Sequence, residues 1–218
     1  MTRRILIAGA SRGIGLGLAA EFAGRGWDVT GTVRGDEAGL AATGARVERL
    51  DMADPASVDA LAERAEPVDV LLVNAGVLGP RHQSAAQVTA DELGQLMLVN
   101  AASPLRLARA MVSKVAADGV VAFMTSELGS LAQATSDYLE LYRASKAALN
   151  MLTRTFAAGP AGGRAVLSLH PGWVRTDMGG SQATLSVEES VTGLADVIAA
   201  ARGPGHRYLD YSGAELPW

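Results

Sequence analysis

Short apolar runs alternate with longer, alanine-rich amphipathic stretches along the whole chain, and no other property of the sequence narrows the possible folds as much. The runs are rich in Val, Ile and Leu, and Gly or Pro residues separate them from the amphipathic stretches. Strands that alternate with helices form βαβ units, and strands that are apolar throughout are buried on both faces of a parallel sheet. The predicted strands span residues 4–9, 28–33, 46–50, 68–74, 119–125, 164–170 and 206–211. The predicted helices lie near residues 13–25, 55–65, 89–117, 138–158 and 186–201.

The predicted fold is a doubly wound parallel α/β sheet of the Rossmann type, with about seven strands flanked by helices. A length of 218 residues suits one α/β domain, expected over residues 1–218, better than two. Ser186 and Glu189 have the spacing of a capping box that opens the last helix.

Composition excludes several classes of function. A net charge of -4 and the lack of any basic run argue against a nucleic-acid partner. With no cysteine, the chain has no disulfide or thiol chemistry, which fits a cytoplasmic location. His82, His170 and His206 lack metal-ligand spacing, so no metal is expected. Two arginines and an apolar run open the chain as in a signal peptide, but the run is short and enters a glycine-rich turn. No apolar stretch reaches membrane-spanning length.

A glycine-rich turn joins the first predicted strand to the first predicted helix. Gly9, Gly13 and Gly15 let the turn tighten and let backbone N–H groups approach a pyrophosphate, while the helix N-terminus supplies partial positive charge. Glycines at a tight turn are weak evidence alone, but the strand-to-helix context predicts a dinucleotide site.

Tyr142 and Lys146 are four residues apart and share one helix face. A tyrosine of ordinary pKa is a poor acid–base group at neutral pH, and a nearby ammonium is expected to lower that pKa. Only Lys114 and Lys146 are lysines, although the chain has 19 Lys+Arg. A compact ammonium can donate to two ribose hydroxyls, which the planar fork of arginine cannot do in the same space.

These motifs together resemble the short-chain dehydrogenase/reductase family over nearly the whole chain. The segments "LLVNAG" (71–76) and "SLHPGWVRTDM" (168–178) are similar to the family's Asn-Ala-Gly and Pro-Gly motifs, whereas Ala8 departs from its usual threonine. The resemblance implies a catalytic set of Ser126, Tyr142, Lys146 and Asn100. The cofactor contacts that it implies are Gly9, Ser11, Arg12, Gly13, Ile14, Gly15, Arg34, Asp51, Met52, Asn74, Ala75, Gly76, Tyr142, Lys146, Pro171, Gly172, Val174 and Thr176.

The end of the second strand favours NADP(H) over NAD(H). An NAD enzyme places a carboxylate there for the ribose 2′-hydroxyl, whereas a 2′-phosphate favours arginine. Val33 occupies the family's acidic position, Arg34 follows it, and Arg12 in the glycine turn could reach the same phosphate. Asp36 is the residue that could reverse this preference if the strand ended later. Asp51 resembles the family's adenine-contacting Asp, or it is a turn residue before the next helix.

The implied reaction is carbonyl reduction to an alcohol, or its reverse, with Tyr142 as the general acid. Ser126 would stabilise charge on the carbonyl oxygen, with Thr125 beside it and Ser130 as a competing assignment. Asn100 resembles the family's helix-bending Asn, which holds a water for proton relay to Lys146. A serine hydrolase using Ser126 and His170 is disfavoured because no nucleophile elbow is present.

Within the family, "YRASKAALNM", "HPGWVRTDMGG" and "YSGAELPW" resemble the C-factor group and sniffer-type carbonyl reductases. Tyr138 and Trp173 are the expected pocket residues for a small carbonyl or alcohol substrate, under a short lid. The alternative is an NADP(H)-binding signalling or sensor protein of C-factor type with little turnover. The resemblance also implies a homo-oligomer, a dimer or tetramer paired through helices near 89–117 and 138–158.

Overall fold

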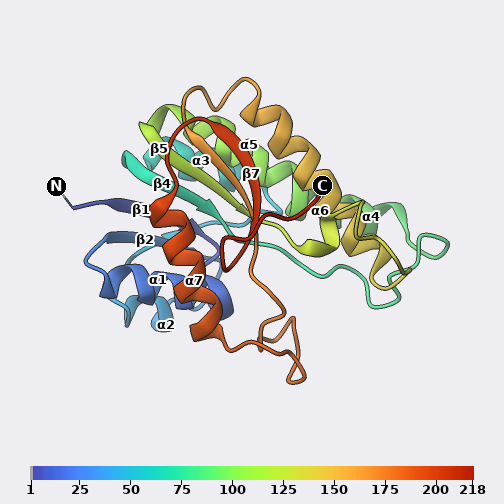
Figure 1. Cartoon of the computed structure of the whole chain (residues 1–218). Helices are drawn as coiled ribbons and strands as arrows, with labels where there is room; N and C mark the ends of the chain where they lie inside the picture. Colours follow the sequence, from blue (N-terminus) through green and yellow to red (C-terminus); the bar gives the residue numbers. More distant parts are fainter. Residues whose placement is uncertain (1) are drawn as a thin grey trace.

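The computed structural model describes residues 2–218 and forms one parallel sheet with helices on both faces (Figure 1). The strand order is β3-β2-β1-β4-β5-β6-β7, and neighbouring strands in this order are all parallel. This confirms the predicted fold class. The strands are β1 (Arg4–Ala8), β2 (Asp28–Val33), β3 (Arg46–Arg49), β4 (Val68–Val73), β5 (Val115–Met124), β6 (Ala165–His170) and β7 (Gly205–Asp210).

The helices follow the predicted alternation with the strands. They are α1 (Gly13–Gly24), α2 (Ala38–Ala41), α3 (Pro55–Arg64), α4 (Ala90–Met97), α5 (Ser103–Met111), α6 (Glu140–Ala157) and α7 (Val187–Ala200), with a π-helical segment η1 (Leu98–Ala102) and 3₁₀ segments η2 (Val112–Lys114) and η3 (Glu127–Gly129). Ser186 and Glu189 form the predicted capping box at the start of α7.

The prediction of one helix over residues 89–117 was wrong in two respects. The π-helical segment η1 interrupts it, and the helical part ends at Lys114, whose ammonium donates to the carbonyl oxygens of Glu63 and Ala65. Val115 then pairs with Val68, so β5 begins earlier than the predicted residue 119. Pairing with β4 overrides the helical pattern of the alanines there. The short helix α2 was not predicted.

Each face of the sheet has its own apolar core. On one face, β1, β2 and β4–β6 pack against α1, α2 and α7, with Phe22, Leu40 and Leu194 fully buried. On the other face, α3, α5 and α6 cover the sheet, and Phe123 of β5 meets Phe156 of α6 edge to face. Alternate residues of the central strands enter opposite cores, which explains why these strands are apolar throughout.

The sheet order places β1 and β4 side by side in the interior, with the chain leaving them in opposite directions. In open α/β sheets, ligands bind outside the carboxyl ends of the strands at such a switch point. The predicted motifs that follow β1 and β4 therefore meet at the end of the sheet where the carboxyl ends of the strands lie.

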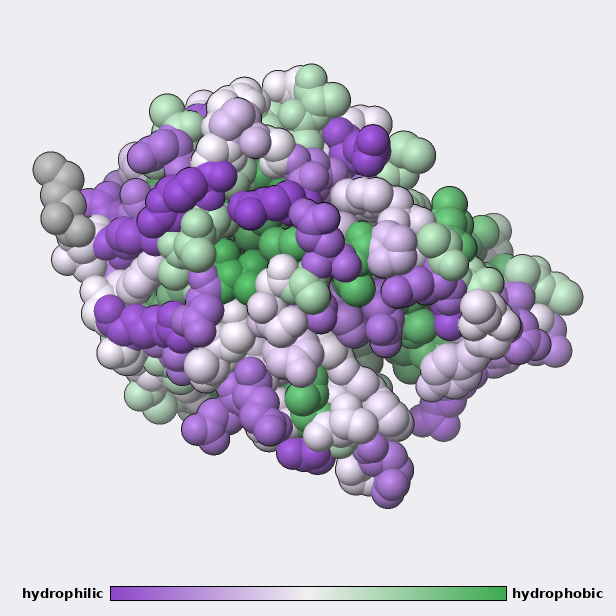
Figure 2. All heavy atoms as spheres, viewed as in Figure 1, coloured by the Kyte–Doolittle hydropathy of each residue, from purple (hydrophilic) through white to green (hydrophobic). Residues whose placement is uncertain are grey.

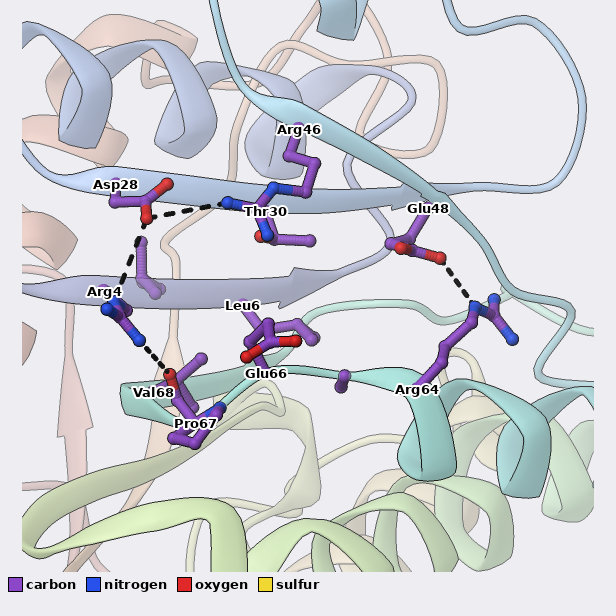
Figure 3. Close-up of a pocket in the computed structure, with 12 residues that line it drawn as sticks. Arg4, Leu6, Asp28, Thr30, Arg46, Glu48, Arg64, Glu66, Pro67 and Val68 are labelled. Carbon is purple, nitrogen blue, oxygen red and sulfur yellow. Dashed lines mark hydrogen bonds and ion pairs between the residues drawn. The ribbon is translucent and has the colours of Figure 1, made fainter.

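The opposite end of the sheet, where the amino ends of the strands lie, has a cavity of about 370 Å³, which is drawn in Figure 3. Its charged side chains pair largely with one another, as Arg64 does with Glu48, and as Arg4 and Arg46 do with Asp28. None of the predicted site residues lines it. On the face shown in Figure 2, hydrophilic and intermediate residues cover most of the surface, and apolar residues show in a recess near the middle and at scattered places on the rim. Within residues 2–218, no helix combines the length and the apolarity that crossing a bilayer would require.

Candidate active site

The glycine turn after β1 is packed too tightly to accept side chains. Gly9 has a φ of +93°, and a Cβ on Gly15 would overlap the Gly9 carbonyl oxygen and come within 2.6 Å of Asn74 Nδ2. Asn74 Nδ2 donates to the same carbonyl oxygen at 2.7 Å. Two predicted motifs, the glycine turn and the Asn-Ala-Gly segment, are thus in direct contact.

The Asn-Ala-Gly segment leads from the glycine turn to the catalytic side chains. The backbone N–H groups of Asn74 and Ala75 both donate to Ala8 O at 2.9 Å. A Cβ on Gly76 would lie 3.3 Å from Asn100 Oδ1 and 3.5 Å from Lys146 Nζ. Gly76 therefore leaves a narrow space in front of both polar groups.

The end of β2 carries the residues that bear on cofactor choice. Val33 is its last residue and is buried, and the exposed Arg34 follows. The Asp36 carboxylate accepts from Ala38 N at 3.0 Å in the next turn, so it lies beyond the strand end. Asp51 Oδ1 accepts from Ala53 N at 2.9 Å, which is a turn contact before α3.

Arg12 is predicted to reach the same 2′-phosphate as Arg34, and this contact stays a prediction. It is the N-cap residue of α1, and its guanidinium forms an exposed ion pair with Asp177. A Cβ on Gly13 would lie 3.3 Å from Thr176 Cγ2. The first turn of α1 thus adjoins the segment that contains the Pro-Gly motif.

The Pro-Gly segment is anchored to α7. Pro171 O accepts from Ser190 Oγ at 2.6 Å, and Gly172 has a φ of +80°, where a Cβ would overlap Leu185. Val174 is buried and forms an isolated parallel β-bridge with Leu185. This holds the segment just beyond the carboxyl end of β6.

The two predicted pocket residues are both solvent-exposed. Trp173 is 51% exposed and donates from Nε1 to Gly179 O at 2.9 Å. Tyr138 is 66% exposed and lies in the turn before α6, not in the helix as predicted. Their role as pocket residues stays a prediction.

Tyr142 and Lys146 share one face of α6, as predicted. The Lys146 ammonium is 5.6 Å from the centre of the Tyr142 ring and donates to Met124 O at 2.9 Å. Burial lowers the pKa of Lys146 to about 8. Burial also raises the pKa of Tyr142 to about 12, opposed by a hydrogen bond with Ser126. The expected lowering of the Tyr142 pKa was therefore wrong here, because desolvation of the phenolate outweighs the hydrogen bond with Ser126.

Ser126 lies just beyond β5 and faces Tyr142. Its Oγ accepts from Leu128 N at 3.2 Å, so the serine caps the 3₁₀ turn η3. The competing Ser130 Oγ is buried and accepts from Gln133 N at 3.2 Å. Among residues 2–218, no hydrogen bond joins Ser126 to His170, whose Nε2 lies 3.7 Å from a Glu127 oxygen instead. This geometry gives no support to a serine hydrolase.

Asn100 lies within the π-helical segment η1 and is fully buried. Its Oδ1 accepts from Val77 N at 2.8 Å, and its Nδ2 donates to Val77 O at 2.8 Å and to Ser145 Oγ at 3.0 Å. The side chain thus ties the bent helix to the Asn-Ala-Gly segment and to α6. A π turn is a frequent mark of functional sites.

Three residues outside the predicted set also hold the site together. Thr32 Oγ1 accepts a hydrogen bond from Gly9 N at 2.9 Å. Gly9 follows Ala8, the position at which the family usually has threonine. The Tyr208 hydroxyl donates to Ser126 O, and Gln83 Oε1 accepts from Tyr142 N at 3.0 Å. None belongs to a local motif, and each acts across a long sequence separation, so no sequence pattern indicated them.

The chain is similar to several known proteins. The family model described as "short chain dehydrogenase" matches residues 3–185. "C-signal" of Myxococcus xanthus is 44% identical over 158 residues, covering 70% of this chain and 93% of that protein. A carbonyl reductase of Pseudomonas aeruginosa PAO1, solved in complex with NADP, superposes with a TM-score of 0.90 at 43% identity over 100% of both chains. The carbonyl reductase Sniffer of D. melanogaster superposes with a TM-score of 0.87 at 29% identity, also over 100% of both chains.

Proposed function

We propose, from the premise that the chain belongs to the short chain dehydrogenase family, that this oxidoreductase uses NADPH to reduce a ketone or aldehyde to an alcohol. One observation carries the proposal. Lys146 Nζ and the Asn100 amide flank the same space in front of Gly76, and the side chain of Tyr142, on the same helix as Lys146, lies beside Ser126. An acid, an oxyanion donor and a buried cation thus meet at the switch point of the sheet.

The chain's own residues fit a dinucleotide. Gly9 and Gly15 leave room that any side chain would fill, and the first turn of α1 offers free N–H groups to a pyrophosphate. The end of β2 carries Arg34 and no carboxylate, which favours a 2′-phosphate. The P. aeruginosa carbonyl reductase, 43% identical, was solved with NADP. When bound, NADPH supplies the hydride that reduces the carbonyl carbon.

Each catalytic side chain has a distinct proposed task. Ser126 donates a hydrogen bond to the carbonyl oxygen, and Tyr142, which is protonated at neutral pH, transfers its proton to that oxygen as the alcohol forms. Lys146 orients the cofactor ribose and stabilises the phenolate left on Tyr142. Asn100 holds the bent helix beside Lys146, where a water can return the proton.

The second candidate is an NADP(H)-binding signalling or sensor protein with little turnover. The 44% identity to C-signal is the observation that favours it. Such a protein needs the glycine turn and Arg34 but gains nothing from Tyr142 and Lys146. The presence of all four proposed catalytic side chains at one site favours the enzyme.

The test is whether the protein oxidises NADPH in the presence of ketones, aldehydes, diketones or quinones. The reaction is monitored as the loss of NADPH absorbance. Wild type, Tyr142→Phe and the matched control Tyr138→Phe are compared, with NADH as the alternative cofactor. We expect turnover that prefers NADPH, that falls at least about 100-fold in Tyr142→Phe, and that persists in Tyr138→Phe. Tight NADPH binding without turnover would favour the sensor, and better turnover with NADH would overturn the assignment of Arg34.

The remaining proposals concern the whole protein. Residues 1–218 would act as one domain, because Tyr208 of β7 bonds to Ser126. A homo-oligomer is proposed because Met151 and Leu152 expose apolar surface on α6, and light scattering would test it with wild type and Met151→Glu. We also propose a cytoplasmic location from the lack of cysteine, which cell fractionation would check.

A further inference from the structure

Two strained residues meet at the start of the helix that carries Tyr142. Among residues 2–218, Gln83 and Leu139 are the non-glycine residues with positive φ, at 52° and 56°. Leu139 is the N-cap of α6, and the side chain of Gln83 contacts the first turn of that helix. Such backbone conformations are strained and persist where the surrounding structure enforces them, often at functional sites.

The buried amide of Gln83 joins two segments far apart in the sequence. Its Nε2 donates to Leu78 O at 2.9 Å and to Pro80 O at 2.7 Å, and its Oε1 accepts from Tyr142 N at 3.0 Å. Gln83 is only 9% exposed, although it lies in a loop. Both the amide nitrogen and the amide oxygen of the Gln83 side chain therefore connect the loop after the Asn-Ala-Gly segment to α6.

The N–H group of Tyr142 requires a partner from outside its helix. Tyr142 is the third residue of α6, so no helical carbonyl is available to it, and the apolar Leu139 cannot supply a side-chain cap. Gln83 takes the place of that cap. A second bond, from Ala85 N to a Glu140 carboxylate oxygen, holds the same loop against the same turn.

The carbonyl group of Tyr142 is held from the other side. Ser145 Oγ donates to Tyr142 O at 2.7 Å and accepts from Asn100 Nδ2, and Asn100 in turn bonds to both backbone groups of Val77. The chain that runs from Val77 to Gln83 is therefore attached to both polar backbone groups of Tyr142. That chain begins directly after the Asn-Ala-Gly segment.

We propose that Gln83 is a positioning residue for the reduction: its side-chain amide fixes the backbone of Tyr142 and sets the phenol at the distance that proton transfer requires. The inference rests on the proposed function. Gln83 touches none of the reacting atoms, so its effect passes through Tyr142. Losing it should slow the proton-transfer step while leaving the glycine turn and cofactor affinity intact.

The experiment compares Gln83→Asn with wild type and with Gln87→Asn, a control on an exposed glutamine of the same loop. Asn tolerates positive φ, so the backbone should be kept, but its shorter side chain cannot span from Leu78 and Pro80 to Tyr142. We expect kcat to fall about tenfold, the NADPH dissociation constant to stay within about twofold, and the solvent deuterium isotope effect on kcat to rise. A loss of folded protein alone would not raise that isotope effect.

Exchange of the Tyr142 amide proton gives a readout that needs no turnover. In Gln83→Asn it should exchange at least about tenfold faster than in wild type or Gln87→Asn, because its acceptor is gone. Unchanged kcat, isotope effect and exchange would overturn the positioning role. If wild type itself shows no turnover, the proposed function fails, and amide exchange alone decides whether Gln83 holds Tyr142.

Discussion

At the scale of single residues, the site depends on what burial does to Tyr142 and Lys146. The two side chains are close enough for the ammonium to favour a phenolate, yet the pKa of Tyr142 rises to about 12. Burial also lowers the pKa of Lys146 to about 8, so this side chain is still mainly an ammonium at pH 7 but loses its charge at a lower pH than an exposed lysine does. A protonated Tyr142 suits reduction, in which it gives up a proton.

The use of lysine at position 146 leads to a prediction about its replacement. Lys146→Arg should lower kcat at least about 100-fold, because the larger planar head cannot occupy the space beside Gly76 that Nζ fills. Steady-state kinetics with NADPH and the best carbonyl substrate would measure this. Lys114→Arg is the matched control, since that lysine, at the end of η2, donates to the carbonyl oxygens of Glu63 and Ala65 at the end of α3 and lies outside the proposed site. Equal activity in both variants would contradict the assigned role.

At the scale of elements, the joint between β1 and α1 is where close packing matters most. Gly15→Ala places a methyl group against Gly9 O and Asn74 Nδ2, so we expect the free energy of unfolding to fall by about 1–3 kcal/mol. NADPH binding should weaken as well. Gly24→Ala in the same helix meets nothing within 4 Å and should raise stability by up to about 1 kcal/mol. Urea unfolding and NADPH titration of both variants test this contrast.

The π-helical segment η1 between α4 and α5 contains one buried amide, that of Asn100. Asn100→Ala removes the partners of both Val77 backbone groups, and we expect a loss of about 2 kcal/mol in the free energy of unfolding. Ser103→Ala is the control, because its buried hydroxyl has no partner and its loss should cost nothing. If chemical denaturation gave the two variants the same stability, the amide would not be what holds the bend.

Most elements were predictable from sequence, because the periodicity of apolar residues and the Gly and Pro residues at the ends of elements are local properties of the chain. Strand and helix limits fell within a few residues, apart from the start of β5, and the glycine turn, Tyr142 and Lys146 lie where their motifs indicated. The π turn, the pairing of Val115 with Val68 and the contacts of Thr32, Gln83 and Tyr208 were missed. Each depends on segments that meet only after the sheet has formed.

At the scale of the whole molecule, burial of Lys146 makes stability depend on pH. Its pKa is about 8 in the fold and near 10.5 when unfolded, so between these values the unfolded chain holds more protons and stability rises with pH. The full difference is roughly 3 kcal/mol. Above about pH 10 the rise is opposed, because burial raises the pKa values of Tyr142 and Tyr208 to about 12 and favours their deprotonation in the unfolded chain.

The measurement is the midpoint of urea unfolding from pH 7 to 10, without added cofactor. Wild type should gain stability relative to Lys146→Met above about pH 8, because Met cannot titrate. A constant difference between the two proteins over this range would show that Lys146 keeps an ordinary pKa.

The sheet order also has a consequence for synthesis. The first strand made, β1, ends up in the interior, and the sheet grows outward from it toward β3 and then from β4 toward β7. Until β5 leaves the ribosome, the apolar strand β4 has an unpaired edge, which is the kind of edge that invites aggregation. Ser126 gains its bond from Tyr208 only when β7 arrives. If the strands pair in the order in which they are made, the contacts around Ser126 are completed last, after a stage in which β4 has an unpaired edge.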